Sequence, residues 1–153
     1  MKTLEIEIKA TKDLASQIYQ DALMIRKEVF VKEQGVDMAL ELDGELGPTH
    51  YVLYYKGKPA ATARTSTSFE QAGWHIQRVA TLKSYRKLGL AKRLLSKIEE
   101  DARQSKVAYL TLGAQDSAQG FYTKLGYQVV GAGFLDAGIA HHRMDKSLQI
   151  KEN

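Results

Sequence analysis

The strongest constraint on the fold of this chain is a glycine-containing turn between a strand-like run and an amphipathic helix. Residues 76–82 alternate in polarity and have high β propensity, which is typical of a strand. After the turn, Leu90, Leu94 and Ile98 recur at intervals of four, so residues 90–104 present one apolar helical face. This order of strand, turn and helix favours a fold that mixes α and β structure.

The turn at residues 86–91 has the chemistry of an anion site. The start of a helix leaves backbone N–H groups unpaired and carries the positive end of the helix dipole, an arrangement best suited to phosphate. Glycine turns also precede helices for steric reasons alone, and the motif by itself does not decide between these readings. Charge agrees with an anion, because residues 83–97 contain no acidic side chain and six basic ones, namely Lys83, Arg86, Lys87, Lys92, Arg93 and Lys97.

A second motif follows further along the chain. Residues 107–113 read as a buried strand, and a short helix is expected after them. Asp116 or Ser117 is expected to cap this helix and Gly126 to end it. Its apolar side would consist of Phe121, Tyr122 and Leu125.

Together, the two motifs resemble a known family. The R-x-x-G-x-A turn from Arg86 to Ala91, then a strand, then F-Y-x-K-L-G-Y from Phe121 to Tyr127 resembles the GCN5-related N-acetyltransferase (GNAT) superfamily, which binds acetyl-CoA. The spacing between the motifs is also the family's. Ala91 stands where much of the superfamily has glycine, but its backbone N–H is unchanged.

Other segments narrow the resemblance to the subgroup of small bacterial acetyltransferases typified by YjcF and ElaA. The resemblance therefore extends from about position 20 to about position 146. The segments that carry it are Arg26–Val36, Glu41–Gly44, His50 and Phe134–His141.

The resemblance implies a fold, a cofactor and a set of binding residues. The expected fold is a single GNAT domain over residues 1–153, an α/β (or α+β) structure whose mixed, splayed central sheet is flanked by helices. Acetyl-CoA is the expected co-substrate, and its pantetheine would pair with the edge of the strand at residues 79–81. The expected cofactor-binding residues are Val79, Ala80, Thr81, Arg86, Lys87, Leu88, Gly89, Leu90, Ala91, Lys92, Gln115 and Tyr122.

Tyr122 is the predicted catalytic residue, because a departing thiolate needs a proton and a tyrosine at this position serves as that acid in the family. A tyrosine on a short helix otherwise usually packs. The base is left open among Glu33, His50, His75, Asp136 and His141. The residues expected near the acceptor amine are Glu33, His50, Asp136 and His141.

Two further expectations concern the acceptor side. Arg26 is expected to form a structural ion pair, with Glu33 or Asp43 as the candidate partners. Residues 35–49 are expected to form a mobile loop over the acceptor, because the segment is acidic and lacks the apolar residues that would hold it down.

The rest of the chain shows no repeat and no long linker. Residues 13–33 are expected to form one long helix or two in succession, with one apolar face. Strands are expected at 4–8, 51–55, 60–67, 71–82, 107–113, 127–130 and 142–148, with a hairpin turn at 56–59 and a pocket-forming segment at 131–141.

Composition limits the function classes. The chain has no cysteine, which excludes a cysteine-bound acetyl intermediate and favours direct transfer in a ternary complex, without metal. The net charge of +4 is concentrated around the turn, so CoA phosphates explain it and nucleic acid is not expected. No apolar run approaches a membrane span, residues 1–8 lack a signal-peptide core, and the expected compartment is the cytoplasm.

Several alternatives stay open at this level. The acceptor is expected to be a small-molecule primary amine, with a protein or peptide amine as an alternative, and a homodimer is compatible with the sequence. A catalytically silent CoA-binding module has the same motifs. The pattern from Arg26 to Asp43 is also similar to acyl-homoserine-lactone synthases, which are usually longer and lack the paired motifs.

Overall fold

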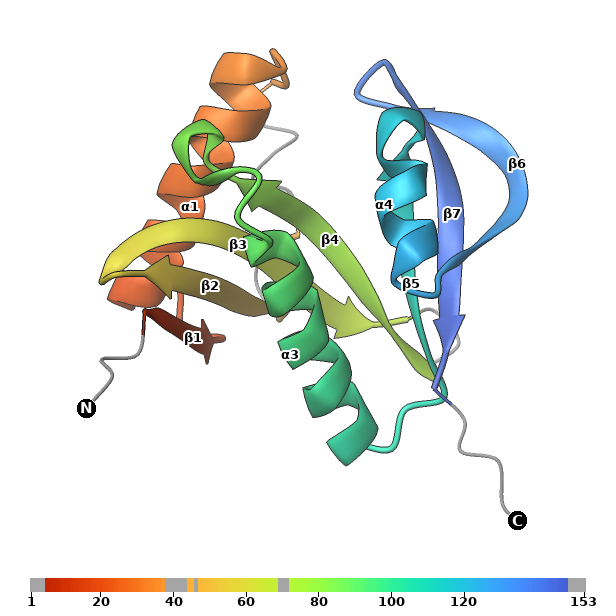
Figure 1. Cartoon of the computed structure of the whole chain (residues 1–153), viewed down its shortest axis with the longest axis horizontal. Helices are drawn as coiled ribbons and strands as arrows, with labels where there is room; N and C mark the ends of the chain where they lie inside the picture. The colour runs from red at the N-terminus through yellow and green to blue at the C-terminus, as the bar shows by residue number, and fades with distance from the viewer. Residues whose placement is uncertain (1–4, 38–43, 46, 69–71, 149–153) are drawn as a thin grey trace. The chain divides into compact units, whose positions relative to one another are not determined.

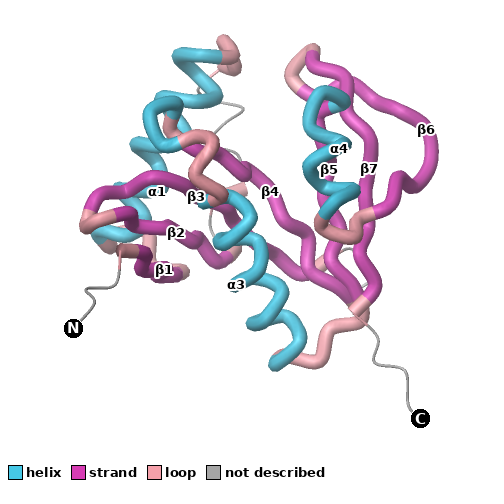
Figure 2. Tube along the Cα trace, in the orientation of Figure 1, coloured by secondary structure: helices cyan, strands magenta, loops and turns pink. Residues whose placement is uncertain are grey.

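In the computed structural model, which describes residues 5–37, 44–45, 47–68 and 72–148, strands and helices mix along the chain (Figures 1 and 2). The seven strands form one mixed sheet in the order β1-β2-β3-β4-β5-β7-β6, and helices flank it, which confirms the predicted fold class. The elements are β1 (Ile6–Thr11), α1 (Gln17–Arg26), η1 (Lys27–Glu33), β2 (Thr49–Tyr55), β3 (Lys58–Thr67), β4 (Gly73–Thr81), η2 (Lys83–Tyr85), α3 (Leu90–Gln104), β5 (Tyr109–Gln115), η3 (Asp116–Ala118), α4 (Gln119–Lys124), β6 (Gln128–Asp136) and β7 (Ile139–Ser147).

The chain divides into two compact units. The first unit contains residues 1–65 and 78–98, and the second contains residues 66–77 and 99–153. β3, β4 and α3 each begin in one unit and end in the other. The expectation of a single domain over the whole chain stays a prediction, and each unit is described below by itself.

The predicted helix at 13–33 is two helical segments in succession. Ser16 caps α1, because its side-chain oxygen accepts a hydrogen bond from the Tyr19 N–H at 3.2 Å. At Lys27 the helix continues without a break as η1, a π-helical segment that ends at Glu33. Met24 lies on the outer side of α1 and is 40% exposed.

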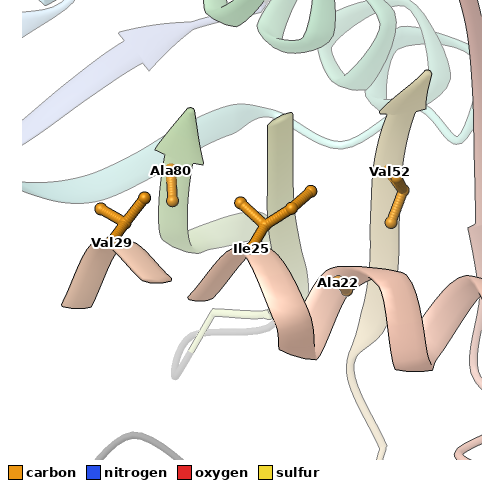
Figure 3. Close-up of a cluster of buried hydrophobic side chains, with 5 residues drawn as sticks. All are labelled: Ala22, Ile25, Val29, Val52 and Ala80. Carbon is orange, nitrogen blue, oxygen red and sulfur yellow. The ribbon is translucent and has the colours of Figure 1, made fainter. Parts of the chain in front are cut away.

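The apolar face of these helices forms a core of the first unit. In Figure 3, Ile25 and Val29 point from the helix toward the strands that carry Val52 and Ala80. Ile25 and Val52 are fully buried, and Ala22 completes the cluster. The i, i+3, i+7 spacing of Ala22, Ile25 and Val29 therefore produces the packing that the sequence predicts.

The predicted hairpin joins β2 and β3. Its turn is shorter than residues 56–59, because β3 already begins at Lys58. Lys56 and Gly57 form the two-residue turn, with φ of 52° and 83°, the left-handed pair that a tight hairpin needs. β1 pairs antiparallel with β2 and starts later than expected, at Ile6.

α3 matches its prediction. Its buried face lies where the apolar spacing places it, and Leu94 and Ile98 have no exposed surface. The remaining buried residues of this helix are Leu90, Leu95 and Ala102.

The second unit differs from prediction at its last two strands. The sequence predicts strands at 127–130 and 142–148, but β6 continues to Asp136 and β7 begins already at Ile139. The role of residues 131–141 in the pocket stays a prediction. The two strands form a hairpin that turns at Ala137 and Gly138, both with positive φ. An irregular register between Val130 and Phe134 hides the strand pattern from the sequence.

We predict that Ile25→Ala lowers the free energy of unfolding by about 2–5 kcal/mol, because it leaves a cavity in a closed core. Urea denaturation would measure the loss. Met24→Ala is the matched control on the same helix and should cost less than about 1 kcal/mol, because its side chain is 40% exposed. Equal losses in the two variants would contradict this account of the core.

Candidate functional site

The end of β4 has the backbone expected of a cofactor-binding edge. β4 pairs in parallel with β5 from Gly73 to Ile76. Arg78 then has a φ of 57°, which interrupts the regular extended backbone. The Ala80 side chain is buried in the core, so this residue can offer a ligand only its backbone N–H and C=O groups.

The turn before α3 also has the expected geometry. Lys87 and Gly89 have φ values of 68° and 74°, so the backbone turns sharply twice before the helix begins at Leu90. The first hydrogen bond of the helix runs from the Arg93 N–H to the Gly89 carbonyl at 3.2 Å. The N–H groups of the first helical turn therefore have no carbonyl four residues earlier within the helix, which suits them to an anion.

Some side chains around this turn are exposed, and one forms an ion pair. Leu88 is 51% exposed, and Lys87 and Lys92 are also exposed. Arg86 instead pairs with Glu33, with Nη2 2.6 Å and Nη1 3.0 Å from the two carboxylate oxygens. The hydrogen bond and charge of Arg86 hold the pKa of Glu33 below its ordinary value.

Tyr122 is buried in the second unit. Its ring contacts Phe121 and Tyr127 edge-on, at centroid distances of 5.1 Å and 5.8 Å. Burial raises the pKa of its hydroxyl to about 12. The phenol is therefore protonated at neutral pH and can only donate its proton to a stronger base or share it in a hydrogen bond.

Asp116 and Ser117 do not cap α4, which corrects the expectation. These residues form the short helix η3, and the residue before α4, Ala118, makes no side-chain cap. The Asp116 carboxylate is engaged elsewhere, because it lies 2.7 Å from Nδ1 of His142 and accepts a hydrogen bond from Gln119 at 3.0 Å. This contact joins η3 to β7 across 26 residues of sequence, so no local pattern indicates it.

The remaining candidates occupy different environments. His50 lies on β2 and is 1% exposed, so an amine could reach it only if the structure opened locally. His141 is buried on β7 and stacks on Phe134 at 5.7 Å, whereas Asp136 is exposed at the end of β6. Gln115 ends β5 and is half-buried. Their roles stay predictions.

These positions fall in both units. The first unit brings Glu33 to the cofactor candidates of residues 79–92. The second unit contains Gln115, Tyr122, Asp136 and His141. In the described part of the chain, no three His, Asp or Glu side chains form a metal-binding group.

A buried ion network was missed at the level of sequence. The Glu45 carboxylate lies 2.7 Å from Arg26 and 2.7 Å from Arg64, and Tyr19 donates a hydrogen bond to it at 2.9 Å. Arg26 therefore pairs with Glu45 and not with Glu33, while Asp43 lies outside the described residues. Glu45 belongs to the segment at 35–49 that is expected to be a mobile loop; residues 38–43 and 46 lie outside the described part of the chain, and the mobility of the loop stays a prediction.

Opposing effects set the protonation of this network. Burial by itself raises the pKa of Glu45, but the hydrogen bond and charge of Arg26 outweigh it, with help from Tyr19 and Arg64. The net pKa of the Glu45 carboxyl is below its ordinary value. Burial lowers the pKa of His50, whose Nε2 lies 3.1 Å from the Glu45 carbonyl oxygen.

Comparison with known proteins places this geometry in a family. Residues 9–148 match the family model described as an acetyltransferase (GNAT) domain. The uncharacterized N-acetyltransferase YjcF of Bacillus subtilis is 35% identical over 129 residues, which cover 83% of this chain and 91% of that protein. The Bacillus subtilis protein YyaT is 36% identical, over 84% of this chain and 88% of that protein.

A solved structure agrees with these sequence relatives. The crystal structure of Escherichia coli ElaA superimposes with a TM-score of 0.80 at 26% identity, over 92% of this chain and 99% of that chain.

Among the residues that the structure describes, no helix is long and apolar enough to cross a membrane.

We predict that Glu45→Gln lowers the free energy of unfolding by about 3 kcal/mol at neutral pH, because two buried guanidinium groups lose their carboxylate. The folded pKa of Glu45 is depressed, so its stabilisation is complete above the unfolded pKa and is lost as the pH falls through the folded one. The difference between wild type and variant should therefore shrink in acid.

Urea denaturation across a pH series would measure this difference. The matched control is Glu28→Gln, which removes an exposed i, i+4 pair with Lys32. That variant should lose less than about 0.5 kcal/mol and show no comparable pH dependence. A Glu45 variant as stable as this control would show that the network does not hold the first unit together.

Proposed function

The chain belongs to the GNAT acetyltransferase family, and on that premise we propose that it moves an acetyl group from acetyl-CoA to a primary amine of a small molecule. A protein or peptide amine is the alternative acceptor. Transfer would be direct, within a ternary complex, since the chain has no cysteine to carry the acetyl group.

The observation that carries the proposal is the turn from Arg86 to Lys92. It joins a helix start, two left-handed backbone positions and exposed lysines in one segment. Backbone N–H groups and the positive end of the dipole would bind the pyrophosphate of CoA there, and Lys87 and Lys92 would add positive charge. The backbone of residues 79–81 would pair with pantetheine as a short added strand.

The chemistry requires an oxyanion and a leaving thiolate to be stabilised. The neutral amine attacks the thioester carbonyl, the resulting tetrahedral intermediate collapses with cleavage of the carbon–sulfur bond, and the amine gives up a proton to a base. A backbone N–H at the end of β4 would donate to the oxyanion. The Tyr122 hydroxyl would donate its proton, or a hydrogen bond, to the departing sulfur.

The direct test is acetyl transfer to a panel of primary amines, followed by detection of the free thiol of CoA. Turnover with at least one small amine supports the proposal. A protein that binds CoA but releases no thiol with any small, peptide or protein amine would instead be a silent binding module.

We predict that Gly89→Asp weakens CoA binding about tenfold or more, because a carboxylate would lie where the pyrophosphate binds. The added side chain has space, since no atom of the described residues beyond its chain neighbours lies within 4 Å of the Cβ position, although φ is 74°. Calorimetry would measure the affinity.

Gly57→Asp is the matched control for this variant. Gly57 has a φ of 83° and equally open surroundings, but it lies in the hairpin turn between β2 and β3. The control carries the same strain and charge and should bind CoA as wild type does. Unchanged CoA affinity in Gly89→Asp would contradict the assignment of the phosphate site to this turn.

We predict that Tyr122→Phe lowers kcat about 10²-fold, because the ring and its packing stay while the proton donor is lost. Thermal stabilisation by acetyl-CoA should match wild type. Tyr127→Phe is the control, since it removes a neighbouring buried hydroxyl whose pKa is likewise raised by burial. Wild-type turnover in Tyr122→Phe would leave Tyr122 a packing residue.

A further inference from the structure

Arg86 uses each nitrogen of its guanidinium within the first unit. Nη1 and Nη2 donate to the two carboxylate oxygens of Glu33, at 3.0 Å and 2.6 Å. Nε donates to the backbone carbonyl of Thr81 at 3.0 Å. One side chain therefore ties together the end of η1, the end of β4 and the turn that leads into α3. A planar, bidentate contact of this kind fixes direction as well as distance.

The contact lies next to a strained part of the backbone. Lys87 follows Arg86 directly and has a φ of 68°, a conformation that residues other than glycine rarely adopt. Such positions persist only where the surrounding structure holds them in place. Arg86 can supply this restraint. Its backbone directly precedes Lys87, and its guanidinium is hydrogen-bonded to Thr81 and to Glu33.

We propose that Glu33 and Arg86 are a positioning pair for the phosphate-binding turn, and that Arg86 holds this turn in shape without contacting phosphate itself. The inference rests on the proposed CoA site and changes the role of two residues within it. Binding of phosphate then falls to the backbone of residues 88–92 and to the exposed Lys87 and Lys92.

The geometry favours this role over direct phosphate binding. To contact phosphate, Arg86 would have to give up a bidentate carboxylate contact and a backbone hydrogen bond together. Lys87 and Lys92 form no ion pair in the described ranges, so they can turn to a ligand without such a loss. A carboxylate that restrains the turn should also strengthen CoA binding, although by itself it repels phosphate.

The experiment tests whether the Glu33 carboxylate strengthens or weakens CoA binding. Calorimetry would measure CoA affinity for wild type, Glu33→Gln, Arg86→Gln and the double variant. A positioning pair predicts that both single variants bind about tenfold more weakly, and that the double variant is no weaker than the single ones. In turnover, KM for acetyl-CoA should rise while kcat at saturation stays near wild type.

Glu28→Gln is the matched control, because it removes an ion pair from the same η1 segment without contacting the turn. It should bind CoA as wild type does. Melting temperatures of all variants should stay close to wild type, since Glu33 and Arg86 are 36% and 39% exposed. Arg86→Lys, which keeps the charge but not the bidentate contact, should not rescue the affinity.

Three results would overturn the pair. If Arg86 bound phosphate directly, Arg86→Gln would weaken binding while Glu33→Gln left it unchanged or tightened it. Additive losses in the double variant would mean independent roles, and wild-type affinity in both single variants would mean no role. If the wild-type protein failed to bind CoA, the proposed function itself would be wrong. This outcome is distinct from the other three.

Discussion

The packing of the first unit depends on the contacts of one buried carboxylate, that of Glu45. It lies between Arg26 of α1 and Arg64 of β3, and Tyr19 donates to the same group. Removing these charges from water is costly, so the arrangement is stable only while the carboxylate and its guanidinium partners remain together. Through Glu45, Arg64 of β3 is connected to Arg26 at the end of α1, the helix that also carries the core residue Ile25.

The proposed phosphate turn is held in the same unit by a second carboxylate. Glu33 ends η1, which continues α1 without a break, and meets Arg86 before the helix α3. Placement of α1 by the buried network therefore also places the partner of Arg86. A strained turn can persist on this support, and strain of this kind is commonly found where backbone groups must face a ligand.

The second unit contains a cluster of buried aromatic side chains around Tyr122. Tyr122 lies between Phe121 and Tyr127, and burial keeps its hydroxyl protonated over the neutral pH range. In the same unit, Gly133 of β6 lies close to β7, because a Cβ there would lie 2.9 Å from the His142 ring. This close approach explains why the strand contains glycine at the point where its register is irregular.

Local patterns in the sequence determined the helix α3, the apolar face of α1, the hairpin of β2 and β3, and the turn before α3. Each of these features follows from the spacing of apolar residues or from the backbone preferences of residues that are close in the sequence. Contacts between distant residues were decided only by the tertiary structure. Glu33 and Arg86 are 53 residues apart, and Tyr19 and Glu45 are 26 apart, so no local pattern pairs them. Asp116 likewise contacts His142, 26 residues away in the sequence, in place of capping a helix.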